Sequence, residues 1–435
     1  MSLQSIDIAH FLFAMGCLLA LAHLLGFLAE RIFIPRVIGE ISAGLVLGPT
    51  LLGHFFPDIF QWMFLGFEGE GKLFGLVYQF GLLMLMFSSG LKFQTKFSKE
   101  DLKITSALVV GATIPAFIAG WLAADLLNVT SYLGSANNPL AIKIIIAISI
   151  AVTSIPVISK IFNDLGIMRT RFAKIVLACA GVHDILLWVA LGYATAIASH
   201  GGTITFSLGF TTILINIGFI AGVLLIGHFL FNRFTFLKNN FLFKASPLGY
   251  FLFIMFMLAA LAGYLHVETI FGALLAGIMI KLSIPTDEVD RIEHTVSKIS
   301  FSWFTPLYFA IVGLQLNLVK NFNPFYFLGF LLFACLIQTL SVYITSRLIK
   351  QDRLTSLNLA IAINDRGGPG IVLASVAYTT GIINQEFFAV IVMLALVTSF
   401  LPGVWFRLVL KKKWRLMPGD ENLVLDKDKE LIDNK

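Results

Sequence analysis

Long apolar segments follow one another along nearly the whole chain, and this feature restricts the possible folds most. A membrane-spanning helix needs about 20 mostly apolar residues, and about 13 segments meet this requirement. Only 13% of the residues are charged, too few to cover the surface of a soluble protein of 435 residues. The sequence therefore predicts an all-α polytopic membrane protein, with a membrane domain over residues 1–410, a short tail over 411–435 and these spans: 7–29, 34–52, 73–91, 102–126, 139–159, 172–198, 206–231, 246–264, 268–284, 299–318, 324–346, 354–379 and 387–408.

The positions of the basic residues predict the orientation of these spans. If the first helix enters from outside, all but four of the 31 Lys and Arg residues lie on the cytoplasmic side. The exceptions are Lys72, Lys143 and Lys320 outside and Arg366 within a span. Because basic residues concentrate in cytoplasmic loops, we expect the N-terminus outside and the C-terminus in the cytoplasm, in a bacterial inner or plasma membrane. The net charge of +6 thus reflects topology and predicts no nucleic-acid partner.

Similar sequences recur about half a chain apart. IGEISAGLVL from Ile38 resembles FGALLAGIMI from Phe271, and the pair matches at three small residues with an offset of 233. Gly90 and Gly313 pair at an offset of 223, and two predicted spans are interrupted about 212 residues apart, at AVTSIPV and NDRGGPG. Each pairing is a shift of seven helices, and an odd shift inverts the second copy. Inverted repeats with corresponding broken helices are typical of secondary transporters, whose binding site lies near those breaks.

A His–Asp pair lies in the middle of an apolar span, at His183 and Asp184. An ionisable residue at this depth is costly and therefore indicates function. In apolar surroundings, a proton and a metal cation can compete for one carboxylate near neutral pH. Asp184 is thus the predicted carrier of a monovalent cation or a proton. The alternative is a structural pair that joins neighbouring helices.

The two helix breaks hold the other candidate residues. Thr153 and Ser154, with backbone carbonyls freed beside Pro156, offer the oxygen ligands that hard cations prefer, unless both hydroxyls simply bond back to their own helix. Asn364, Asp365 and Arg366 precede Gly367 at the second break. If the half-helix ends face one another there, Asp365 and Arg366 are expected to compensate the helix dipoles rather than bind the ion. Glu40, in another span, is expected to donate or accept a hydrogen bond in helix packing.

The order of these motifs resembles the second branch of the monovalent cation:proton antiporter superfamily, which includes Kef-type potassium/proton antiporters and plant cation/proton exchangers. The resemblance covers residues 7–410 and rests on RIFIPRVIGEISAGLVLGP, LLMLMFSSGL, AVTSIPVISKIFNDLG, ETIFGALLAGIMI, FTPLYFAIVGL and NDRGGPGIVLA. It implies a 13-helix fold with a dimerisation domain and a mobile core that contains crossed, unwound fifth and twelfth helices. It also implies exchange of K⁺ or Na⁺ for H⁺ by an elevator motion, and a homodimer in the lipid membrane.

Carried onto this chain, the family's ion-binding aspartate falls on Asp184 and its crossing arginine on Arg366. Two positions depart from the pattern: His183 stands where relatives have Asp, Asn or Gln, and Gln338 stands where many have a lysine. His183 is therefore a candidate substitute for the missing cation and is expected to give a pH dependence near 6 to 7, from its ordinary pKa of about 6.5. If Asp184 alone exchanges ligands, transport is electroneutral; if His183 also releases a proton, it is electrogenic. We expect the electroneutral case.

Two other functions share this fold. One is a Kef-like potassium efflux pathway without obligatory exchange, and the other is a sensor that has lost transport. The catalytic and nucleotide-binding signatures HExxH, CxxC, GxGxxG and GxSxG are missing from the sequence, so neither an enzyme nor a cofactor is expected.

Overall fold

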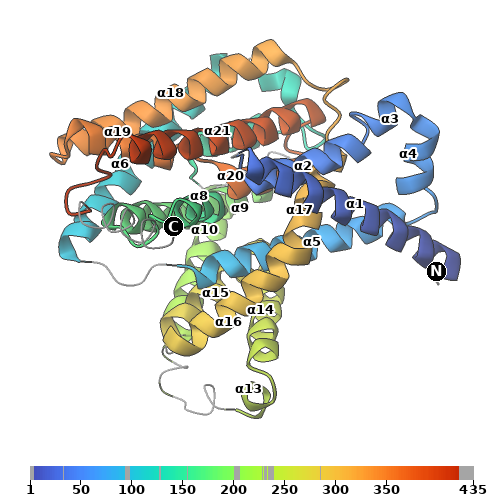
Figure 1. Ribbon diagram of the computed structural model, residues 1–435, viewed down its shortest axis with the longest axis horizontal. Helices are drawn as coiled ribbons and strands as arrows, with labels where there is room; N and C mark the ends of the chain where they lie inside the picture. Colours follow the sequence, from blue (N-terminus) through green and yellow to red (C-terminus); the bar gives the residue numbers. More distant parts are fainter. Residues whose placement is uncertain are drawn as a thin grey trace, which may run out of the picture. The chain divides into compact units, whose positions relative to one another are not determined.

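The computed structural model describes residues 4–32, 34–93, 98–126, 129–153, 155–199, 206–227, 229, 233, 240–284 and 286–420. Within these residues the regular structure is helical apart from an isolated bridge between Leu133 and Ile383. The chain divides into two compact units (Figure 1). Unit 1 comprises Met1–Thr95 and Phe210–Asn321, and unit 2 comprises Lys96–Gly209 and Phe322–Lys435. Each unit therefore combines two segments that are far apart in the sequence.

Membrane-spanning helices are present in both units. Among the described residues, eight helices are long and apolar enough to cross a membrane, and three shorter apolar helices accompany them. These helices confirm the predicted multi-span α-helical protein. Long helices alone do not add up to the predicted total of about 13 spans, because several predicted spans are split into two short helices.

Unit 1 contains the first helices of each half of the repeat. Its elements are α1 (Ser5–Arg31), α2 (Arg36–Leu47), α3 (Leu52–Phe55), α4 (Pro57–Phe64), α5 (Glu70–Leu91), the π-helical η2 (Gly222–Gly227), α13 (Phe241–Ala245), α14 (Pro247–Tyr264), α15 (Thr269–Ser283), α16 (Thr286–Ile299), the π-helical η3 (Ser300–Phe304) and α17 (Thr305–Gln315). Helix α10 (Phe206–Ala221) spans the boundary between the units. In Figure 1 the blue helices α2 and α5 lie beside the yellow-orange α17.

Glycines bring the helices of unit 1 into backbone contact and confirm the repeat. Helix α2 packs on α17 where Gly44 meets Gly313, and α5 packs on α15 where Gly90 meets Gly277. A Cβ atom built on Gly44 would lie 1.9 Å from the carbonyl oxygen of Ala310, so only glycine fits there. The four glycines were paired by sequence as Gly44 with Gly277 and Gly90 with Gly313. The same contact is therefore made twice, each time between a helix of one copy and a helix of the other.

The start of each copy is equivalent too. A Cβ atom on Gly39 of α2 would meet the carbonyl oxygen of Leu25 in α1 at 2.3 Å, and one on Gly272 of α15 would meet that of Leu258 in α14 at 2.5 Å. Small residues allow such close approach in membrane helices, where packing rather than hydrophobicity drives association. The pair α1–α2 is thus repeated as α14–α15.

Unit 2 contains the two interrupted helices. Its elements are α6 (Lys99–Leu126), the 3₁₀ turn η1 (Val129–Tyr132), α7 (Pro139–Ala151), α8 (Ile155–Asp164), α9 (Arg171–Ser199), α18 (Pro324–Leu348), α19 (Arg353–Ile363), α20 (Gly367–Thr379) and α21 (Gln385–Lys411). Both interruptions lie where the sequence predicts them, between α7 and α8 and between α19 and α20. The second is shorter than NDRGGPG, because Gly367 already begins α20 with φ +30°, a backbone conformation that favours glycine.

The sequence did not predict three parts of the structure. Helix α16 is polar and amphipathic and follows α15 in a region expected to be a loop, and α3 and α4 occupy the expected loop before residue 73. The first residues of the predicted tail also pack against unit 2, since Leu416 and Met417 are fully buried and Asp420 is 1% exposed. A search for 20-residue apolar segments overlooks such short or polar elements.

Candidate functional site

The two helix interruptions of unit 2 are in direct contact. Thr153, two residues after α7 ends, donates a hydrogen bond from Oγ1 to the carbonyl oxygen of Ile363 at 2.5 Å. Ile363 is the last residue of α19. The hydroxyl of one broken helix thus satisfies a backbone group of the other. Ser154, the second predicted hydroxyl, lies outside the described residues.

Arg366 neutralises the C-terminal end of α7. Its Nε donates to the carbonyl of Ser149 at 2.8 Å, and Nη2 donates to Ile150 at 2.9 Å and to Ala334 of α18 at 3.1 Å. Nη1 donates to the backbone oxygen of Asn364 at 3.1 Å and to its Oδ1 at 2.7 Å. All five guanidinium N–H groups are therefore used, and two of the accepting carbonyls lie at the C-terminal end of α7, where a positive charge is favourable.

The neighbours of Arg366 also bond within unit 2. Asp365 is fully buried and accepts a hydrogen bond at Oδ1 from the hydroxyl of Ser399 in α21 at 2.7 Å, whereas its Oδ2 has no partner among the described residues. Asp365 lies two residues before α20 begins, where a negative charge suits the helix dipole. Asn364 donates from Nδ2 to Thr339 of α18 at 3.2 Å. The three residues thus join α18, α20 and α21.

Asp184 is buried, and its side chain has no hydrogen-bond partner in the described part of the chain. It lies in α9 with 1% of its surface exposed, and neither carboxylate oxygen has a partner among the described residues. Buried polar side-chain atoms nearly always have a hydrogen-bond partner, and a buried charge without one is costly. Of the candidate residues, Asp184 is therefore the one whose side chain most lacks hydrogen-bond partners among the described residues.

His183 lies beside Asp184 but points to the interruption. Its Nδ1 is 3.1 Å from Oγ1 of Thr153, and its Nε2 is 3.8 Å from the sulfur of Cys179, one helical turn earlier. His183 is 2% exposed and Cys179 is fully buried. The structure thus brings His183 and Thr153 together, as the sequence suggested. Cys179 was overlooked because cysteines in apolar helices usually serve packing, although its i, i+4 spacing from His183 was a usable signal.

Gln338 contacts the end of α7. It is fully buried in α18, and its Nε2 lies 3.5 Å from the carbonyl oxygen of Ala151, a long hydrogen bond. Its Oε1 has no partner among the described residues. Together, Arg366 and Gln338 contact the last three carbonyls of α7, at Ser149, Ile150 and Ala151. These carbonyls are therefore not free ligands, and the carboxylate of Asp184 is the better candidate for binding a cation.

Glu40 belongs to unit 1 and makes a local ion pair. It is 3% exposed, and its Oε1 accepts from Nε of Arg36, one turn earlier in α2, at 2.9 Å. Nη2 of Arg36 also contacts Nδ1 of His23 in α1 at 2.5 Å, so the pair connects α1 and α2. This arrangement suits the packing role that the sequence predicts for Glu40.

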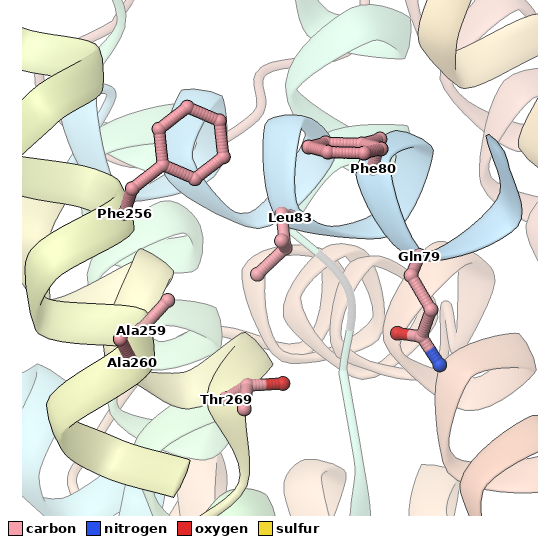
Figure 2. Close-up of a pocket in the computed structure, with 7 residues that line it drawn as sticks. All are labelled: Gln79, Phe80, Leu83, Phe256, Ala259, Ala260 and Thr269. Carbon is pink, nitrogen blue, oxygen red and sulfur yellow. The ribbon is translucent and has the colours of Figure 1, made fainter. Parts of the chain in front are cut away.

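A separate pocket of about 460 Å³ in unit 1 contains none of the predicted site residues (Figure 2). Its lining is mostly apolar, with Phe80 and Leu83 of α5 and Phe256 of α14. Gln79 and Thr269 provide its polar side chains. A cation needs several oxygen ligands, so this pocket does not suit an ion.

Comparison with known proteins places the chain in a family. The transmembrane sodium/hydrogen exchanger family matches residues 18–412. The chain is 28% identical over 398 residues to K(+)/H(+) antiporter 1 of Saccharomyces cerevisiae, covering 88% of this chain and 44% of that protein. It is 27% identical over 397 residues to Na(+)/H(+) antiporter NhaS4 of Synechocystis sp., covering 88% and 93%. The chain thus spans less than half of the yeast relative and nearly all of the cyanobacterial one.

The fold has a solved counterpart. The sodium proton antiporter MjNhaP1 of Methanocaldococcus jannaschii superposes with a TM-score of 0.65 and 17% sequence identity, covering 92% of this chain and 98% of that one. The family match confirms the resemblance that the sequence motifs indicate. With 395 of its 435 residues inside the matched range, this chain belongs to the sodium/hydrogen exchanger family.

Proposed function

We propose that this chain is a secondary-active antiporter that exchanges Na⁺ or K⁺ for protons, with Asp184 carrying the cation and the proton in turn. The family and the antiporters that resemble the chain support this exchange. The observation that carries the proposal is the buried Asp184 carboxylate, which has no protein partner among the described residues. Such a group is stable only when a proton or a cation neutralises it, and these are the two states that exchange requires.

One cation moves for one proton in this proposal. Arg366 is the single cation among the predicted site residues, and all its N–H groups bond to fixed oxygen acceptors. Gln338 carries no charge where many relatives of the superfamily carry a lysine. We therefore expect the charge at the site to change only at Asp184, with His183 and Asp365 keeping their protonation through the cycle, which makes transport electroneutral.

The exchange is measured with purified protein in proteoliposomes that contain a pH-sensitive dye. A sodium or potassium gradient should drive protons the opposite way, and Asp184→Asn should abolish this flux while the protein remains folded. Asp125→Asn, which changes an exposed carboxylate of the same unit paired with Lys143, is the matched control and should retain exchange. Repeating the assay with each alkali cation determines the ion preference.

The same assay separates the alternatives. A Kef-like efflux pathway would release cations without moving protons against a gradient. A sensor would show no flux in the unmodified protein either. Unchanged exchange in Asp184→Asn would refute the role proposed for this carboxylate.

The proposal extends to the whole transporter in its membrane. The N-terminus lies outside a bacterial inner or plasma membrane, the C-terminus lies in the cytoplasm, and two copies form a homodimer. In an elevator mechanism the unit that holds the ion site moves, and here unit 2 holds Asp184. Labelling of Lys320→Cys, but not of Lys412→Cys, by a membrane-impermeant maleimide in intact cells would support this orientation; the reverse pattern would contradict it. A background without the three native cysteines is needed.

A further inference from the structure

Four buried polar groups form a continuous chain across unit 2. The sulfur of Cys179 lies 3.8 Å from Nε2 of His183, and Nδ1 of His183 lies 3.1 Å from Oγ1 of Thr153. Oγ1 of Thr153 lies 2.5 Å from the carbonyl oxygen of Ile363. All four residues are at most 2% exposed. This series of hydrogen-bonded groups joins α9, the interruption after α7 and the end of α19.

The donor and the acceptor of each hydrogen bond follow from the last group in the series, the carbonyl of Ile363. A carbonyl oxygen can only accept, so Thr153 must donate its one hydroxyl proton to Ile363. The hydroxyl oxygen can then only accept from His183, which requires a proton on Nδ1. The geometry therefore requires a proton on Nδ1 of His183.

We propose that His183 is a positioning residue, which donates a hydrogen bond from Nδ1 to Thr153 and so fastens α9 to the junction of the two interrupted helices. The inference rests on the proposed function, because its consequence is the placement of Asp184. His183 is then a fixed donor to Thr153 rather than a replacement for the missing lysine. This role differs from the titrating His183 that the sequence suggested.

Fixing His183 also fixes the direction of Asp184. Successive residues of an α-helix point about 100° apart, so a His183 ring held against Thr153 turns the next side chain away from this hydrogen-bonded chain. The carboxylate of Asp184 accordingly has no partner among the described residues. The tether thus keeps α9 in register with the interruptions while the carboxylate stays available to its ligand.

Two matched pairs of variants test this role in the proteoliposome assay. His183→Asn keeps an N–H donor near the position of Nδ1, whereas His183→Leu removes it; Thr153→Ser keeps the hydroxyl, whereas Thr153→Val removes it. His183→Leu and Thr153→Val should each raise the KM for the cation about tenfold or more, as expected for loss of one buried hydrogen bond. The conservative variants should recover most of this loss. Equal defects in His183→Asn and His183→Leu would overturn the inference.

The proton on Nδ1 is measured by ¹⁵N NMR of the histidine-labelled protein in nanodiscs. His183 is assigned from the signal that disappears in His183→Asn, and at the pH of transport it should show a protonated Nδ1. An unprotonated Nδ1 would overturn the inference even if a variant failed to fold. Failure of the proposed function is seen separately, as exchange that survives Asp184→Asn.

Discussion

At the scale of single residues, the chemistry of this protein depends on which buried groups have partners. Arg366 uses every N–H group, and Thr153 donates to one residue and contacts another, whereas both oxygens of Asp184 are left without a described partner. Buried groups that are hydrogen-bonded are held rigidly, whereas a buried carboxylate with no described partner at either oxygen is the natural place for a ligand. The contrast between Arg366 and Asp184 separates the structural charge from the proposed ion-binding one.

Replacing Arg366 by lysine should damage both stability and exchange. Lysine keeps the positive charge but has three N–H donors on one atom, so it cannot reach the carbonyls of Ser149, Ile150 and Ala334 together. Each buried carbonyl left unpaired costs about 1–3 kcal/mol. We expect a lower Tm and at least a tenfold slower exchange in Arg366→Lys. Arg347→Lys, at the end of α18, is the control; equal Tm values for all three proteins would contradict the role assigned to Arg366.

Sequence reasoning at this scale identified the ionisable residues but not their partners. A carboxylate or arginine in an apolar span is visible in the sequence because of its cost in lipid. The hydroxyl of Ser399 and the thiol of Cys179 give no such signal, since both residue types occur routinely in membrane helices. The occupied carbonyls of α7 were also unpredictable, because their partners, Arg366 and Gln338, are about 190 to 220 residues away.

At the scale of helices, the repeat is encoded mainly by glycine. The sequence showed which glycines correspond, but it did not show that Gly44 touches Gly313 or that Gly90 touches Gly277. Correspondence is a property of sequence, whereas contact depends on how the helices cross. The interruptions were predictable for a different reason, because Pro and Gly in an apolar span disturb the helix locally.

Adding a methyl group at the repeated crossings should destabilise unit 1. A Cβ atom on Gly44 would lie 1.9 Å from a backbone oxygen, and one on Gly277 would lie 2.5 Å from the carbonyl oxygen of Phe87. Gly44→Ala and Gly277→Ala should therefore each cost about 1–3 kcal/mol or more and lower the Tm in detergent. Gly16→Ala and Gly329→Ala are matched controls because nothing lies within 4 Å of a Cβ there. Both controls should leave the Tm equal or higher; equal effects at all four sites would show that the crossings are not tight.

The cap of α19 gives a pH dependence outside the membrane spans. Asp352 accepts from the backbone N–H groups of Leu354 and Thr355 and from the Thr355 hydroxyl. Burial opposes ionisation of Asp352, but the hydrogen bonds from Thr355 and Leu354 and the charge of Arg415 together outweigh it and lower the pKa of this carboxyl below 3.8. A lowered pKa means that the cap stabilises the folded protein above pH 3.8 and loses this effect as pH falls through the pKa of the folded state.

Asp352→Ala should therefore cost about 1 kcal/mol at neutral pH, as for other N-caps. Thermal unfolding at pH 7 and at the lowest pH the protein tolerates measures this, and the difference between variant and unmodified protein should shrink in acid. Asp352→Asn keeps a capping oxygen and should lose less stability at pH 7. A difference that grows in acid would contradict the cap.

At the scale of the whole molecule, the two units differ in the structural features that they contain. Unit 1 has close glycine contacts and an apolar pocket, and unit 2 contains the interruptions and every predicted site residue except Glu40. The sequence predicted the all-helical fold, the repeat and the breaks, because each depends on local hydrophobicity or on Gly and Pro. The family resemblance implied a dimerisation domain and a mobile core, but the bounds of the two units were not predicted, since each unit is assembled from two distant segments.

The central claim, that a cation and a proton compete for Asp184, is tested most directly by counting the protons released on cation binding. The purified protein is kept in a weakly buffered solution near neutral pH, and NaCl or KCl is added while choline chloride controls for ionic strength. The unmodified protein should release one proton for each bound cation, and Asp184→Asn should release none. Cation binding without proton release, or the same release from Asp184→Asn, would contradict it.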